Sequence, residues 1–129
     1  MPRYLSPEWL EAAQQAVATD ASLATATKDV QLTVQQVVTG GPAGDAAFHV
    51  TIDDGAVRVA RGEAVDATVT FIQDWETASA ISRGDLSAQG AFMAGRVRIR
   101  GDLPKLIEYG NVFGEVSDVF AGLRVSTTY

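Results

Sequence analysis

Few residue types in this chain could carry out catalysis. His49 is the only histidine, and the sequence contains no cysteine. Because histidine alone titrates near neutral pH without a large pKa shift, a serine-histidine-acid triad would have to use His49. It lies mid-way along an alternating segment, on the face opposite Phe48 and Val50, and no nucleophile-elbow motif occurs. We therefore interpret His49 as an exposed strand residue and predict that the protein is not an enzyme.

Metal and phosphate sites find equally little support. Zinc sites take three or four histidine, cysteine or carboxylate ligands, and this chain offers one imidazole and no thiol. The paired acids Asp53 and Asp54 are better explained by the turn that they occupy. Gly90–Gly95 has the glycine spacing of a phosphate-binding loop, but Arg96 and Val97 replace the lysine and hydroxyl residue that hold phosphate and magnesium. We expect no metal and no cofactor.

Three arginines, Arg96, Arg98 and Arg100, alternate with Val97 and Ile99. On a strand this spacing places the arginines on one face and the two apolar residues toward the core. The whole chain carries a net charge of −6, and no aromatic residue interleaves with the arginines. Both features are unlike nucleic-acid-binding surfaces. We predict a solvated outer sheet face and no nucleic-acid partner, with a weak anion-binding patch as the alternative.

The first half of the chain predicts one helix followed by an antiparallel meander. A serine cap, a proline and an acid at Ser6–Glu8 start an amphipathic helix, and a polar connection rich in alanine and threonine follows. From Val30 onward apolar residues recur at every second position, which is typical of a half-buried strand. The pattern loses phase at Gln35-Gln36, where we expect a bulge or a frayed strand end. The loop over residues 40–45 and the Asp54-Gly55 turn then join three strands.

The second half predicts two more strands among helices. A fourth strand over residues 67–71 precedes a helix capped by Asp74 and a short helix over about residues 87–94. The arginine segment forms the fifth strand, and Asp102 caps a final helical region. Two glycines weaken that region near its middle, Gly110 and Gly114. The predicted class is α+β, with a five-stranded, mostly antiparallel sheet in a single domain over residues 1–129.

This order of elements, together with one motif, resembles the sterol carrier protein 2 family of lipid-binding domains. The motif is AFMAGRVRIRGD, from Ala91 to Asp102. The family typically shows Ala-Phe-Met, a small residue and glycine, then basic residues alternating with apolar ones and a final Gly-Asp. Shorter matches lie at Asp66–Thr70 and Ser82–Gly84, and the resemblance covers about residues 32–123. The chain is most similar to a bacterial stand-alone member.

The resemblance implies a sheet covered by helices around an apolar tunnel that holds fatty acids, fatty acyl-CoA or sterols without chemistry on them. It implies that Phe92 and Met93 face the lipid or the core and that the arginines lie outside. Together with the apolar positions of the predicted elements, it suggests a tunnel with eleven lining residues. They are Phe48, Val50, Phe71, Trp75, Ile81, Phe92, Met93, Leu106, Phe113, Val116 and Phe120.

A second hypothesis comes from a different class of function. Related domains resemble accessory or dimerisation parts of larger enzymes, so the chain could bind a partner protein while its cavity is vestigial. The beginning of the sequence lacks the apolar region of a signal peptide, and no apolar run reaches about 18 residues. We therefore expect a cytoplasmic protein. Contact with an anionic membrane surface, a lipid-metabolising enzyme or a second copy of the chain is left open.

Overall fold

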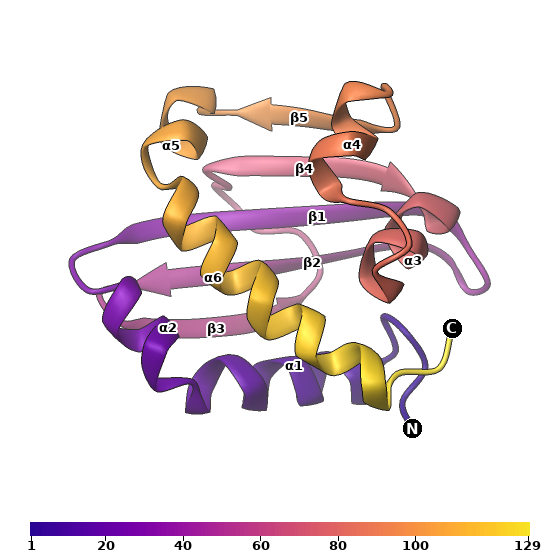
Figure 1. Cartoon of the computed structure of the whole chain (residues 1–129), viewed down its shortest axis with the longest axis horizontal. Helices are drawn as coiled ribbons and strands as arrows, with labels where there is room; N and C mark the ends of the chain where they lie inside the picture. The colour runs from indigo at the N-terminus through magenta and orange to yellow at the C-terminus, as the bar shows by residue number, and fades with distance from the viewer.

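A five-stranded sheet runs through the computed structural model, which describes residues 1–129 (Figure 1). The strands lie in the order β3-β2-β1-β4-β5. All neighbours are antiparallel except β1 and β4, which are parallel because the chain crosses over between β3 and β4. The predicted α+β class and mostly antiparallel sheet are confirmed. The strand bounds are β1 Gln31–Gly41, β2 Gly44–Asp53, β3 Ala56–Arg61, β4 Val69–Asp74 and β5 Val97–Gly101.

The helices lie on one face of this sheet, which we call the inner face (Figure 1). In that view α1 runs along β3, α6 crosses the sheet diagonally, and α3 and α4 lie beyond α6 near the end of β4. None of the helices combines the length and apolar character that a membrane span requires. The helix bounds are α1 Pro7–Thr19, α2 Ala21–Ala26, α3 Trp75–Arg83, α4 Ala88–Met93, α5 Leu103–Glu108 and α6 Gly110–Ala121, followed by the 3₁₀ helix η1 Gly122–Ser126.

Side-chain caps begin most of these helices, as the sequence predicts. The oxygens of Ser6, Asp74 and Asp102 each accept a hydrogen bond from the backbone N–H three residues later. The connection expected after α1 is instead the short helix α2, so that expectation was wrong. Asp20 caps it by accepting from the N–H of Leu23, and the Leu23 side chain is fully buried. Alanine-rich segments favour helix even without an amphipathic stripe, which is why periodicity missed it.

The bulge expected at Gln35-Gln36 is also absent. Residues 31–38 of β1 pair with β2 without interruption, and the register shifts only between residues 38 and 41. Gln36 therefore lies on the inner face, where its Oε1 accepts a hydrogen bond from Nε2 of Gln73 at 2.7 Å. Gln35 lies on the outer face and accepts from the N–H of Ala64 in the crossover. Because Gln36 has a hydrogen-bonded partner, its side chain can point inward, and β1 continues past it without a bulge.

Local turn chemistry fixes the meander. Asp54 and Gly55 have φ of 46° and 87°, as a two-residue turn with both central residues left-handed requires, so the predicted hairpin is confirmed. His49 lies on the outer face as predicted, but it is half-buried, and its Nδ1 lies 2.9 Å from the carbonyl oxygen of Gly62. This contact holds the start of the crossover against β2. His49 thus has a structural partner in the backbone of the crossover.

The largest cluster of the hydrophobic core packs α1, α2 and α6 against β1, β2 and β3. Trp9 at its centre contacts both Phe48 and Phe120 edge-on, with ring centroids 5.9 Å apart in each case. The residues of this cluster are Trp9, Leu10, Ala13, Val17, Leu23, Val30, Leu32, Phe48, Val50, Ile52, Val57 and Val112. The half of the inner face over β4 and β5 buries smaller side chains, which are Val69, Ala78, Ala91 and Val97.

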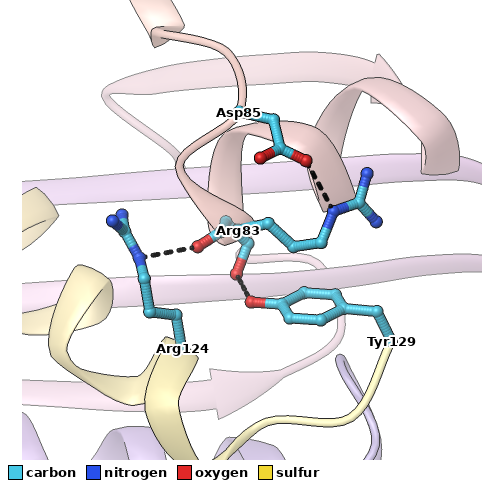
Figure 2. Close-up of polar contacts among 5 residues, drawn as sticks. Arg83, Asp85, Arg124 and Tyr129 are labelled. Carbon is cyan, nitrogen blue, oxygen red and sulfur yellow. Dashed lines mark hydrogen bonds and ion pairs between the residues drawn. The ribbon is translucent and has the colours of Figure 1, made fainter.

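Polar contacts fasten the chain after α6 to the end of α3 (Figure 2). Nε of Arg124 donates to the carbonyl oxygen of Ser82 at 3.2 Å, and the Tyr129 hydroxyl lies 2.6 Å from the Ser82 hydroxyl. Arg83 forms an ion pair with Asp85 at 3.0 Å, and its guanidinium lies over the Tyr129 ring at 5.5 Å. The segment that follows α6 is thereby tethered to the C-terminal end of α3.

Candidate functional site

Two large apolar side chains on the inner side of β4 and β5 are less buried than Val69 and Val97 of the same strands. The register pairs Phe71 directly with Ile99, and directly paired residues share a face of a sheet. Both are half-buried. Phe113 of α6 meets Phe71 edge-on, with ring centroids 6.3 Å apart. We call Phe71, Ile99 and Phe113 the apolar inner face. It is a partly exposed hydrophobic surface on the side of the sheet where the helices lie.

Nine of the eleven residues predicted to line a tunnel occupy three environments. Phe48 and Val50 are buried in the core, and the ring of Phe120 stacks on Phe48 at 6.1 Å. Trp75 packs against Tyr4 of the N-terminal segment, with ring centroids 5.3 Å apart. Five others are half-buried and come from β4, α3, α5 and α6: Phe71, Ile81, Leu106, Phe113 and Val116. The structure thus brings Phe71 and Phe113 together, and separately Phe48 and Phe120.

The remaining two, Phe92 and Met93, are not core residues. Their exposed fractions are 50% and 78%, the opposite of what a place in the core would give. The short helix α4 buries Ala91 instead, so only its small-residue side packs inward. Since the family motif allows these two side chains to face either lipid or core, contact with lipid stays a prediction.

The arginine segment follows the predicted alternation over most of its length. Arg98 and Arg100 are exposed on the outer face, where they pair with Ile72 and Thr70. Arg96 precedes the strand, and its Nε donates to the Thr77 hydroxyl at 3.1 Å. The expectation of an outer, solvated arginine face is confirmed for two of the three residues. The third joins β5 to the first turn of α3.

The shifted pKa in this part of the molecule belongs to Asp74, the residue that caps α3. The Thr77 backbone N–H and then its hydroxyl hold the pKa of the Asp74 carboxyl below its usual value, and the Arg96 guanidinium adds to that effect. Ser79 has the one buried side-chain oxygen without a hydrogen-bond partner. No group of three or more histidine and acidic side chains is placed to hold a metal ion. What the apolar inner face offers chemically is hydrophobic contact.

Sequence reasoning missed the polar pair on this side of the sheet. Gln36 and Gln73 occupy inward positions in neighbouring parallel strands, and their hydrogen bond lies beside Phe71 in the sheet. The available signal was a glutamine at an otherwise apolar inward position in each of two strands. Each residue by itself looks like a break in periodicity, and only their shared register makes them a pair.

Solved structures with this fold include a sterol carrier protein 2 and a related bacterial protein. A sterol carrier protein 2 crystal structure has a TM-score of 0.75 and 18% identity, covering 92% of this chain and 98% of that one. A conserved protein of Thermus thermophilus, described as possibly a sterol carrier protein, has a TM-score of 0.74 and 18% identity, covering 95% and 91%. These likenesses confirm the fold.

The same fold also occurs as a segment of a larger enzyme. The stereoselective inverting sec-alkylsulfatase Pisa1 from a Pseudomonas species has a TM-score of 0.51 and 18% identity, covering 74% of this chain but 14% of the enzyme. No curated protein matches the chain significantly by sequence. The model of the SCP-2 sterol transfer family matches residues 10–114, from the first helix into α6. On that match, which spans most of its length, the chain belongs to the SCP-2 sterol transfer family.

Proposed function

We propose that this protein binds a hydrophobic lipid at the apolar inner face and transfers it without chemistry on it. The observation that carries the proposal is the position of Phe71, Ile99 and Phe113. They are half-buried on the helix-covered side of the sheet and are not members of the main core cluster, although Phe113 packs against its edge. Partly exposed apolar surfaces of this kind mark binding grooves for apolar partners. Membership of the SCP-2 sterol transfer family supports a lipid as the apolar partner.

The ligand we propose is a fatty acid, a fatty acyl-CoA or a sterol. Burying a dozen methylene groups of an acyl chain is worth roughly 10 kcal/mol, at about 0.8 kcal/mol each. Losses of translational, rotational and side-chain freedom remove a large part of that figure. Micromolar affinity is therefore reachable through apolar contact alone. A binding site of this kind requires no charged anchor.

The lining that we propose centres on Phe71 and Phe113 and draws on the half-buried side chains around them. Leu106 and Val116 flank Phe113 on α5 and α6, and Phe92 of α4 is the exposed aromatic nearest to β5 in the sequence. Phe48 and Val50 support the site from within the core, and Phe120 packs against that core. On this view the family motif supplies one wall of the site through Phe92, while Arg98 and Arg100 on the outer face take no part in it.

A binding titration of delipidated protein with a fluorescent long-chain fatty acid tests the proposal. We expect saturable binding at micromolar concentrations that unlabelled fatty acid or sterol reverses. Phe113→Ala should weaken binding about tenfold, because a phenylalanine contact with the lipid is lost. Phe120→Ala is the matched control. It removes the same ring from the same helix, but where that ring packs on Trp9 and Phe48.

Both variants are expected to lose stability, so each must be confirmed as folded by circular dichroism at the titration temperature. An affinity lowered for Phe113→Ala and kept within about twofold for Phe120→Ala supports the site. Equal losses in the two variants would show that stability, and not contact with the ligand, controls the signal. Absence of saturable binding by the parent protein would refute the lipid-binding function itself.

The alternative function is an accessory module that binds a partner protein. The specific observation in its favour is the sulfatase, in which this fold forms a minor part of a longer chain. Native mass spectrometry of the protein purified from its own host separates the two functions. A co-purifying lipid supports the carrier, whereas an empty protein in a stable complex with one enzyme supports the module.

A further inference from the structure

A half-enclosed cavity of about 400 Å³ lies between the N-terminal segment, the β1–β2 hairpin, the end of β3 and the start of α3. In Figure 1 the N-terminal segment lies beside the right-hand ends of β1 and β2, close to α3. Four large side chains contribute to the walls: Tyr4, Leu10, Phe48 and Trp75. The volume falls within the usual range for pockets that take small organic molecules.

This cavity is separate from the apolar inner face. Its Phe48 wall is backed by Trp9 and Phe120, whose rings lie 5.9 Å and 6.1 Å from that of Phe48. Phe48 and Trp9 are almost fully buried, so they form a filled partition. Neither Phe71 nor Phe113 lines the cavity. A molecule bound here would therefore not be the lipid that we propose for the apolar inner face.

The cavity carries two unpaired cations in a protein of net charge −6. Arg3 and Arg61 line it, both are exposed, and neither side chain forms a hydrogen bond or an ion pair. Asp45 supplies the single lining carboxylate, and that carboxylate accepts a hydrogen bond from the N–H of Gly40 at 2.9 Å. The lining thus has a net charge of about +1. Guanidinium groups bind planar carboxylates through paired N–H donors, and a single surplus charge favours a monoanion over a phosphate dianion.

Tyr4 adds a fixed aromatic ring to the lining. Its ring packs between Trp9 and Trp75, with centroids 5.1 Å and 5.3 Å away. Burial, with a smaller effect of Tyr129, raises the pKa of Tyr4 well above its usual value. The phenol therefore keeps its proton at every physiological pH and adds no negative charge to the lining.

We infer that this cavity binds a small organic monocarboxylate with an aromatic or short alkyl body. Tyr4, Phe48 and Trp75 would contact the apolar body, and Arg61 with Arg3 would bind the carboxylate. Arg61 is held more firmly of the two, because it belongs to β3 and pairs with Phe48 across the sheet. The register thus places an arginine residue directly beside Phe48 of the aromatic wall.

The test uses 4-phenylbutyrate and its neutral counterpart 4-phenylbutan-1-ol as probes, titrated into the full chain and followed by ¹H–¹⁵N NMR. We expect the carboxylate to bind with a dissociation constant of about 1 mM or tighter, as its dozen heavy atoms allow. The largest shifts should fall on the Trp75 indole N–H and on the amides of residues 41–48. The alcohol should bind at least threefold more weakly.

Arg61→Gln should weaken 4-phenylbutyrate binding about fivefold, the range of a partly exposed ion pair. Arg58→Gln is the control, since Arg58 is an exposed arginine of the same strand that pairs with Thr51 on the outer face. It should leave the affinity unchanged. Equal affinities for acid and alcohol, equal effects of the two arginine variants, shifts confined to β4, β5 and α6, or no binding at about 10 mM would each overturn the inference.

Discussion

The hydrogen bond between Gln36 and Gln73 gives the sharpest stability prediction. The two side chains meet on the inner face, where Nε2 of Gln73 donates to Oε1 of Gln36 at 2.7 Å. Both residues are half-buried in a sheet whose other inward positions nearby are apolar. Changing either residue alone to leucine leaves the other amide without its partner. Changing both removes the pair and its desolvation cost together.

The expected magnitudes follow from that geometry. Leaving a buried polar group unsatisfied costs about 1–3 kcal/mol, and half-burial places each single variant near the lower end, at about 1 kcal/mol. The double variant should lie within about 0.5 kcal/mol of the parent, because leucine gains the hydrophobic contact that glutamine lacks. The coupling free energy between the two substitutions is then about 1.5–2.5 kcal/mol. For 129 residues, 1 kcal/mol corresponds to a shift in Tm of about 4 °C.

The assay is a double-mutant cycle by urea denaturation, with far-UV circular dichroism and tryptophan fluorescence recorded on the same samples. Coincident transitions establish that one free energy of unfolding describes each variant. A coupling near zero, with the double variant as destabilised as the sum of the singles, would refute the reasoning. The inward glutamines would then act through water or through side-chain volume.

Three further predictions concern the caps and the arginine face. Asp74→Ala should cost about 1 kcal/mol at pH 7. The pKa of Asp74 is lower in the folded state, so the stability that its carboxylate provides is fully present above the unfolded pKa of about 3.9. This stability is lost as the pH falls through the folded-state pKa. The urea midpoints of variant and parent should therefore converge in acid. Gly84→Ala should cost about 1 kcal/mol in the same assay, because Gly84 has a φ of 88° and an added Cβ would lie 2.6 Å from the Arg124 guanidinium; unchanged stability would contradict this. Changing Arg98 and Arg100 to Gln together should leave the lipid affinity in solution within about twofold of the parent value. The change should slow lipid transfer to anionic vesicles, since each basic residue near such a surface contributes about 1 kcal/mol. Equal transfer rates would contradict a contact between these arginines and the membrane.

Features with local chemical signals could be predicted from the sequence. The Asp54-Gly55 turn, the Asp74 cap and the Gly84 end of α3 each depend on residues within one turn of themselves, and all three are confirmed. The alternation also placed Phe71 and Ile99 on the inward side correctly. Such local signals are reliable here because the backbone geometry that these residues favour is the geometry that they adopt in the fold.

Features set by distant partners could not be predicted in the same way. Gln36 looked like a defect in its strand because its partner Gln73 lies on another strand, in a register that periodicity does not encode. Trp75 has the spacing of a core residue, yet its neighbour is Tyr4, from the far end of the chain. The exposure of Phe92 depends on how α4 rests on the sheet through Ala91. The family resemblance supplied the overall order of elements and could not supply these contacts.

The central claim is that a lipid binds at the apolar inner face, and photolabelling tests it most directly. Delipidated protein is loaded with a long-chain fatty acid carrying a diazirine mid-chain, irradiated, digested and sequenced by mass spectrometry. We predict labels on the strand and helix segments that contain Phe71, Ile99 and Phe113, and their loss when unlabelled palmitate competes. Labels confined to the segments of Tyr4 and Trp75, or spread over the surface and insensitive to competitor, would contradict the claim.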